Sequence, residues 1–185
     1  MGQHVETLWH KEHDLKGVDT VVLPGGFSYG DYLRSGAIAR FSPIMQEVAQ
    51  HAKKGCLVFG VCNGFQVLCE AGLIPGALLH NEGQKFISKN ISIRPATRNT
   101  ALTNAVPYKA LKIPIAHGEG RYYIGESDYN RVLDNGQVVF RYARNPNGSL
   151  DDIAGIVSEN GRVLGMMPHP ERALDRLVGG SEDGR

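Results

Sequence analysis

Apolar runs alternate with amphipathic stretches and polar loops along the first half of the chain. Val18–Leu23 and Cys56–Val61 are apolar almost throughout, which is typical of parallel strands buried on both faces. Between them, Ser42 followed by proline supplies a helix start, apolar residues recur at helical spacing, and Gly55 supplies the stop. A second helix is predicted over Asn63–Ala71. This half of the chain therefore predicts βαβ units with parallel strands.

The second half has shorter apolar stretches at closer spacing. Two Asn-Gly pairs, at 135–136 and 160–161, favour the tight turns of β-hairpins. We therefore expect antiparallel strands after the βαβ units. The whole chain predicts an α/β fold, a three-layer sandwich with a mixed, mostly parallel central sheet. Further strands are expected at Val5–Trp9, Ile91–Arg94, Ile113–His117, Val138–Tyr142, Ile153–Ser158 and Val163–Met167.

Length, charge and cysteine content limit the possible functions. The chain has 185 residues, which suits one domain over residues 1–185, and a net charge of +1 from 20 Lys and Arg against 19 Asp and Glu. This balance argues against nucleic acid and membrane surfaces as partners. No apolar run reaches the roughly 20 residues that cross a bilayer. Three cysteines without a CxxC pair predict free thiols, no metal site and a reducing, cytoplasmic setting.

The strongest chemical signal is a cysteine at a predicted junction of strand and helix. In Gly60-x-Cys62-x-Gly64 both residues two positions from the cysteine are glycines, as a nucleophile on a sharp elbow requires. The N-terminus of the following helix is expected to lower the thiol pKa. The N–H of Asn63 is placed to face a developing oxyanion. The alternative is a small buried core residue, which is what most free cysteines are.

A second signal follows the last predicted strand, in Pro168-His169-Pro170-Glu171. The prolines favour an extended backbone, in which side chains two residues apart project to the same side. A carboxylate at Glu171 would then hold the His169 imidazole in one tautomer. That imidazole can act as a base toward a cysteine and as an acid toward a leaving amine. A surface histidine in a proline turn is the alternative, because the chain has 7 histidines.

The loop after the first of the two apolar strands is rich in glycine. Gly25 and Gly30 have the spacing of a phosphate-binding loop, but Asp31 stands where that loop needs lysine, so we exclude nucleotide binding there. Backbone N–H groups of the loop can instead form half of an oxyanion hole, and a plain tight turn fits the spacing equally well.

His10 and His13 resemble a metal pair only loosely, and solvated side chains are favoured. The stronger signals together predict acyl transfer from an amide or an ester.

Several segments carry a resemblance to a known family. Gly60–Gln66 (GVCNGFQ) and Pro168–Glu171 (PHPE) resemble the nucleophile and His–Glu motifs of the class I, or triad, glutamine amidotransferases. The resemblance implies a flavodoxin-like α/β fold and is closer to members that act in purine biosynthesis. The other matching segments are Pro24–Arg34 (PGGFSYGDYLR), His80–Asn90 (HNEGQKFISKN), Arg94–Thr103 (RPATRNTALT), Pro114–Tyr122 (PIAHGEGRY) and Met166–Arg172 (MMPHPER).

The resemblance implies a role for each matching position. Cys62 would attack the side-chain amide of glutamine. His169 would protonate the departing ammonia and then activate water, and Glu171 would orient His169. Gly26 and Asn63 would supply the backbone donors of the oxyanion hole. The residues implied to bind the amino-acid part of glutamine are Gln66, His117, Gly118 and Glu119.

The resemblance also implies partners. Ammonia would pass to a separate large, ATP-binding synthetase subunit, and a small third subunit would bridge the two. ATP and Mg²⁺ would belong to that partner, so no cofactor is expected in this chain. Compared with the family, the chain is expected to lack a β–α unit before the segment matching Val5 and a helix after the segment matching Leu177.

Two other functions remain compatible with these residues. The chain would be a non-catalytic docking fragment of such a complex, or it would be a cysteine hydrolase or peptidase built on the same elbow. The hydrolase would turn over peptides or esters without preference for glutamine.

Overall fold

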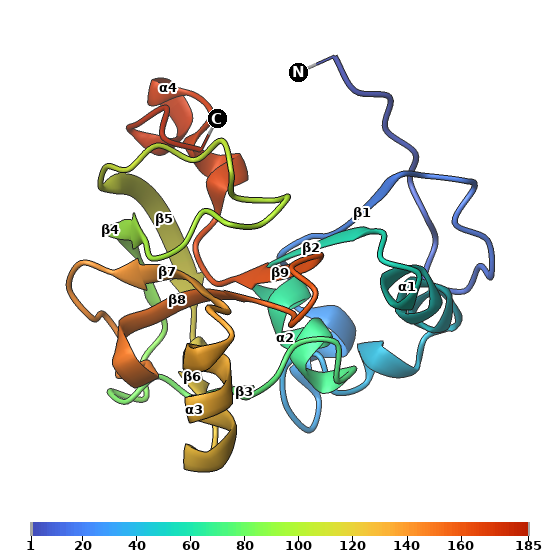
Figure 1. The fold of residues 1–185 in the computed structure, drawn as a ribbon, viewed down its shortest axis with the longest axis horizontal. Coiled ribbons are helices and arrows are strands. Elements are labelled where there is room, and N and C mark those ends of the chain that lie inside the picture. Colours follow the sequence, from blue (N-terminus) through green and yellow to red (C-terminus); the bar gives the residue numbers. More distant parts are fainter. Residues whose placement is uncertain (1, 185) are drawn as a thin grey trace.

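The computed structural model describes residues 2–184, and within them seven strands form one mixed sheet. The strands are β1 (Thr20–Leu23), β2 (Leu57–Val61), β3 (Ala77–Leu79), β4 (Ile87–Pro95), β5 (Leu111–His117), β6 (Arg121–Tyr123), β7 (Val138–Tyr142), β8 (Ile153–Val157) and β9 (Val163–Met166). The sheet has the order β1-β2-β9-β8-β7-β4-β5 (Figure 1). The remaining two, β3 and β6, form a separate antiparallel pair.

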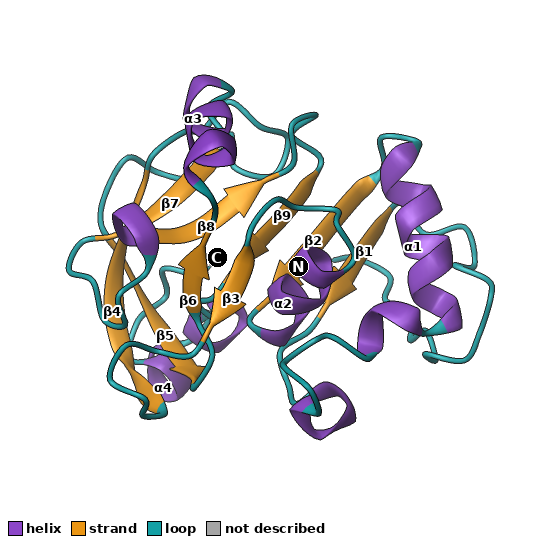
Figure 2. Cartoon of the chain, turned by 90° about the horizontal axis from the view of Figure 1, so that it is seen from below, coloured by secondary structure: helices purple, strands orange, loops and turns teal. Residues whose placement is uncertain are grey.

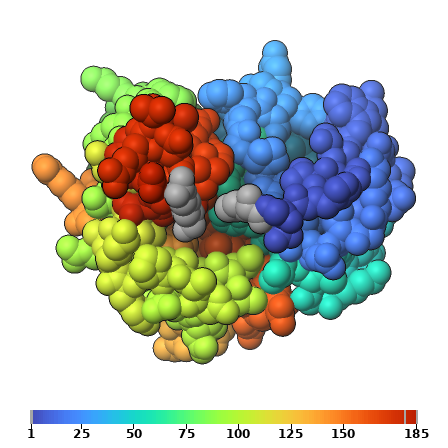
Figure 3. Space-filling view, turned by 90° about the horizontal axis from the view of Figure 1, so that it is seen from above, coloured from blue at the N-terminus to red at the C-terminus, as the bar shows by residue number. Residues whose placement is uncertain are grey.

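Helices cover mainly one face of the sheet. They are α1 (Pro43–Lys53), α2 (Asn63–Glu70), α3 (Glu126–Asp134) and α4 (Arg176–Gly179). The first three lie on the same face, in front of the strands in Figure 2. On the other face, shown in Figure 3, the red C-terminal segment and the blue N-terminal segment lie on opposite sides. An apolar core lies against each face of the sheet. Pro170–Ala173 packs against β5, and Ala173 is part of the second core.

The predicted α/β class and mixed sheet are confirmed. Helix α1 begins directly after Ser42, with proline as its first residue, and ends before Gly55. Its buried residues Ile44, Val48 and Ala52 recur at helical spacing and join the core that includes Val58 of β2. The helix connects β1 to β2, which are parallel neighbours, so the predicted βαβ unit is present.

The expectation of a mostly parallel sheet is wrong. Only the pairs β1–β2 and β2–β9 are parallel, and the other four pairs of neighbours are antiparallel. The predicted hairpin at Asn160-Gly161 joins β8 to β9. The other Asn-Gly pair forms no hairpin, because Asn135 and Gly136 end α3, with Gly136 at φ +62°. An Asn-Gly pair fits the end of a helix as well as a hairpin turn, because glycine readily adopts the positive φ that both can require.

Two predictions for the N-terminal region are also wrong. Strand β1 is buried on one face only: Val21 lies in the core, whereas Val22 is 57% exposed. This follows from its position at the sheet edge, where helices cover one face. No strand forms over Val5–Trp9, and the side chains of both end residues are exposed. A short apolar pattern forms a strand only where a neighbouring strand completes its hydrogen bonds.

Candidate active site

Cys62 lies on the predicted elbow between β2 and α2. Its φ is +50°, a conformation that is strained for a residue other than glycine. The flanking glycines make the turn possible, because a Cβ on Gly64 would clash with the carbonyl oxygen of Leu23 and one on Gly60 would lie 2.7 Å from the carbonyl carbon of Gly64. The N–H of Cys62 donates to the oxygen of Met166 at 2.8 Å, which fixes the elbow against β9.

The Cys62 thiol is buried and neutral. Burial raises the pKa of the Cys62 thiol to about 11. A hydrogen bond from the backbone of Asn63 and the charge of Arg172 lower this pKa, but by less than burial raises it. The expected lowering of the thiol pKa is therefore wrong for this structure. The helix N-terminus acts in the expected direction, and desolvation outweighs it. At neutral pH the sulfur thus needs a base before it can attack.

This neutral thiol predicts a steep pH dependence of alkylation. In the isolated chain, the rate of Cys62 alkylation by iodoacetamide should rise about tenfold per pH unit between pH 7 and 10, because only the thiolate reacts and its fraction rises in that proportion below the pKa. Mass spectrometry of the Cys62 peptide measures the rate separately from those of Cys56 and Cys69. A rate that is already constant at pH 7 would contradict the neutral thiol.

His169 lies next to Cys62. A Cβ added to Gly25 would lie 2.7 Å from Cε1 of His169 and 3.5 Å from Cβ of Cys62, so both side chains contact the same point of the loop after β1. The N–H of His169 donates to the oxygen of Pro114 in β5 at 2.8 Å. The predicted partner is in place, since Nδ1 of His169 lies 2.6 Å from Oε1 of Glu171.

The Glu171 carboxylate determines which nitrogen of His169 carries the proton. Burial raises the pKa of Glu171, but the hydrogen bond to His169 and the charges of His169 and Arg172 outweigh it, so the pKa is lowered. An ionised carboxylate only accepts hydrogen bonds, so Nδ1 holds the proton and Nε2 has the lone pair. Nε2 is buried and has no hydrogen-bond partner among the described residues. It is therefore free to act as a base.

An open pocket of about 150 Å³ lies beside Cys62. Gly26, Gln66 and the turn His117–Glu119, all predicted from the resemblance, line it. The amide of Gln66 is already engaged: its Nε2 donates to the oxygen of Glu119 at 2.5 Å, and its Oε1 accepts from Nδ2 of Asn63 at 2.9 Å. Gln66 thus joins the elbow to the turn that forms the opposite wall.

His117 contributes a neutral imidazole to the pocket wall. Burial and the nearby His169 lower the pKa of His117 to about 4. Its Nδ1 lies 3.0 Å from Oδ1 of Asn81, and Nδ2 of the same asparagine donates to the His117 oxygen at 2.8 Å. Nδ1 therefore carries the proton, and Nε2 is an acceptor without a partner in the described structure. The sequence did not identify Asn81, which only the fold brings to this turn.

The sequence analysis placed Glu119 at the pocket but did not place Asp31, Ser35 or His80 there. Asp31, Ser35 and His80 belong to the lining, and Asp31 lies near Glu119. Burial and the charge of Glu119 raise the pKa of Asp31, although a hydrogen bond with Ser35 opposes them. The two carboxylates are far apart in the sequence, so no local spacing links them.

Other candidate features remain outside the pocket. His10 bonds the hydroxyl of Tyr29 through Nδ1, and His13 faces Glu47 at 4.0 Å. Across residues 2–184, no three side chains of His, Cys, Asp or Glu are grouped as metal ligands would be. None of the helices in that range has the length and apolar character needed to cross a bilayer.

The fold and the site define a class of protein: an α/β enzyme in which an elbow cysteine, a carboxylate-held histidine and an adjoining pocket are arranged for acyl transfer. Residues 1–180 match the family of CobB/CobQ-like glutamine amidotransferase domains. The chain belongs to this family, and the resemblance found in the motifs is confirmed.

Named relatives are close along nearly the whole chain. The phosphoribosylformylglycinamidine synthase subunit PurQ of a Nostoc species is 56% identical over 184 residues, which are 98% of this chain and 82% of that protein. PurQ of Mycobacterium bovis is 57% identical over 185 residues, 100% of this chain and 83% of that protein. A chain in the structure of PurLQS from Thermotoga maritima is 47% identical, with a TM-score of 0.84, over 92% of this chain and 76% of that one.

Proposed function

We propose that this chain is the glutaminase subunit of a phosphoribosylformylglycinamidine synthase. It hydrolyses glutamine to glutamate and ammonia through a cysteine thioester, and the ammonia enters purine biosynthesis. The names of the close relatives support this assignment. The observation that carries it is the Cys62 elbow with His169 and Glu171 beside an open pocket.

In the acylation step, Nε2 of His169 takes the thiol proton as the sulfur of Cys62 attacks the amide carbon of glutamine. The backbone N–H groups of Asn63 and Gly26 receive the developing oxyanion. The carbon–nitrogen bond then breaks, and the proton on Nε2 passes to the departing ammonia. The carboxylate of Glu171 stabilises the imidazolium while it exists. A γ-glutamyl thioester on Cys62 remains.

In the second step, Nε2 of His169 takes a proton from water, and the resulting hydroxyl attacks the thioester carbonyl. The carbon–sulfur bond breaks, the proton returns to the sulfur, and glutamate leaves. The neutral imidazole of His117 offers Nε2 as a hydrogen-bond acceptor to the bound glutamine. Gly118 and Glu119 complete the pocket wall around the amino-acid part of glutamine.

The ammonia passes to a large, ATP-binding synthetase subunit, and a small subunit bridges the two proteins. The solved neighbour is titled as a PurLQS structure, which supports such an assembly. ATP and Mg²⁺ act in the synthetase, and this chain contributes no cofactor. Three free cysteines support a reducing, cytoplasmic location.

Labelling with a diazoketone analogue of glutamine tests this function. In the assembled complex we expect one label per chain, on Cys62, because the analogue places its electrophilic carbon where the amide carbon of glutamine binds. Excess glutamine should protect the site. The Cys62→Ala variant should not be labelled, and the matched Cys56→Ala variant should be labelled normally.

Two other outcomes would contradict the proposal. Absence of labelling in the assembled complex would indicate a docking fragment without catalysis. Labelling that glutamine does not prevent, together with turnover of simple esters, would indicate a general cysteine hydrolase.

A further inference from the structure

The loop after β1 extends along α2. At the N-terminal end of α2, the N–H of Ser28 donates to Oδ1 of Asn63 at 3.1 Å, and the Ser28 hydroxyl bonds the same oxygen. Farther along the helix, Gly36 packs so closely that a Cβ there would lie 2.7 Å from the nitrogen of Val67. Residues 27–36, which we call the β1 loop, therefore follow the helix that carries the nucleophile elbow.

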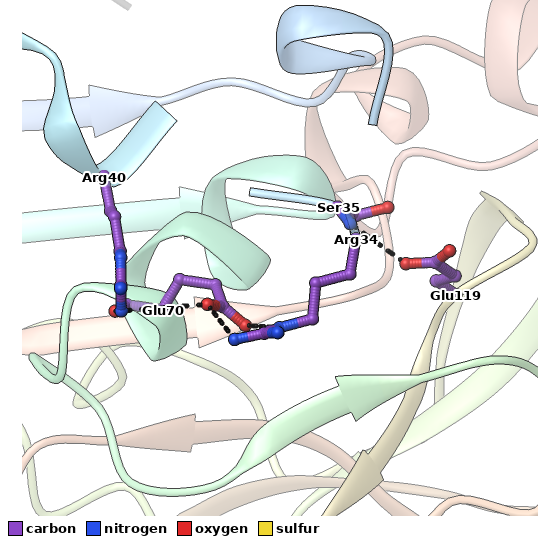
Figure 4. Close-up of polar contacts among 5 residues, drawn as sticks. All are labelled: Arg34, Ser35, Arg40, Glu70 and Glu119. Carbon is purple, nitrogen blue, oxygen red and sulfur yellow. Dashed lines mark hydrogen bonds and ion pairs between the residues drawn. The ribbon is translucent and has the colours of Figure 1, made fainter. Parts of the chain in front are cut away.

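A paired set of hydrogen bonds joins this loop to the C-terminal end of α2 (Figure 4). Nε of Arg34 donates to Oε1 of Glu70 at 2.5 Å, and Nη2 donates to Oε2 at 2.7 Å. The Glu70 side chain is only 9% exposed, whereas the Arg34 side chain is 57% exposed, so the carboxylate is shielded from solvent and the guanidinium is not. The two-bond geometry makes this pair stronger than an ordinary surface ion pair. The next residue, Ser35, donates its N–H to Oε2 of Glu119 at 3.1 Å. The same short stretch thus contacts α2 and the pocket wall.

The backbone of the β1 loop is strained, and it needs such contacts. Tyr29, Asp31 and Leu33 have φ values of +55°, +55° and +70°, which side-chain-bearing residues rarely adopt. Burial does not offset the strain at Leu33, because Tyr32 is 74% and Leu33 is 90% exposed, although Ser35 near the end of the loop is buried. The conformation therefore depends on polar contacts with its surroundings.

We propose that Arg34 is a positioning residue for glutamine hydrolysis, acting through its paired hydrogen bonds to Glu70. These bonds hold the β1 loop against α2, which keeps Phe27 and Asp31 in the pocket lining beside Cys62. Neither Arg34 nor Glu70 is among the residues that line the pocket, so their effect passes through the loop. This inference rests on the proposed glutaminase function.

The test compares steady-state kinetics of variants in the assembled complex. In Arg34→Gln and in Glu70→Gln, the KM for glutamine should rise about tenfold, with a smaller change in kcat, because the pocket wall loosens while the elbow keeps its own contacts. Arg34→Lys should give an intermediate KM, since lysine keeps the charge but not the two-bond geometry. The double variant Arg34→Gln/Glu70→Gln should be no worse than either single variant.

The matched control is Arg131→Gln, which removes an exposed ion pair with Asp128 on α3 and should leave the KM unchanged. Synthesis from ammonium salt should be unchanged in every variant. A wild-type KM in Arg34→Gln, or effects that add in the double variant, would overturn the inference and leave the glutaminase function intact. A wild-type complex that does not hydrolyse glutamine would overturn the proposed function itself, and this inference with it.

Discussion

Replacing Cys62 by serine should abolish glutamine-dependent synthesis in the assembled complex and leave synthesis from ammonium salt at the wild-type rate. A serine hydroxyl is a far weaker acid than a thiol, and His169 is arranged to deprotonate a thiol, so no acyl-enzyme should form. We expect a fall of at least about a thousandfold, equivalent to roughly 4 kcal/mol in the barrier. Added ammonium salt supplies ammonia directly to the synthetase subunit, so this synthesis does not need glutamine hydrolysis by the present chain.

The two activities are measured on the same preparation, so loss of assembly is distinguished from loss of chemistry. Cys56→Ser is the matched control, since Cys56 lies just before β2 and outside the pocket lining, and both activities should survive in it. If both activities fall together in Cys62→Ser, the division of labour between the subunits is wrong.

Replacing His169 by alanine should have the second largest effect. The imidazole takes a proton in both steps and returns one to the leaving ammonia, so its removal should lower glutamine turnover about 10²- to 10⁴-fold. Glu171→Gln should also lower turnover, because an amide can donate to Nδ1 and place the proton of His169 on the wrong nitrogen. Rapid-quench measurement of glutamate formation gives these rates.

A histidine remote from the site provides the control. His13 is exposed, and the His13→Ala variant should turn over glutamine at the wild-type rate. Unchanged turnover in His169→Ala would exclude the role given to this imidazole, whatever the behaviour of the other variants.

The candidate catalytic residues could be located from sequence because their determinants are local. Glycines on both sides of Cys62 are needed by the elbow itself, and the spacing of His169 and Glu171 in an extended segment places their side chains together. The thiol pKa could not be predicted in the same way. It depends on how deeply the elbow is buried, which the packing of the whole domain decides.

The pocket wall was less accessible to sequence analysis. Asn81 meets His117, Ser35 meets Glu119, and Arg34 meets Glu70 only because the fold brings distant segments together. Helix α3 was missed for a different reason. Only Tyr129, Val132 and Leu133 of its nine residues are apolar or aromatic, so the helical spacing is too short a signal in a largely polar segment. The order of the sheet was likewise set by long-range pairing, and local patterns do not reveal it.

Mass spectrometry of the wild-type complex during turnover tests the central claim most directly. The reaction with glutamine is quenched in acid, which preserves thioesters, and the chain is then digested. The account predicts that the peptide containing Cys62 gains the mass of one γ-glutamyl group, and that hydroxylamine removes it. Formation of glutamate and ammonia with no such adduct, or with the adduct on another residue, would contradict it.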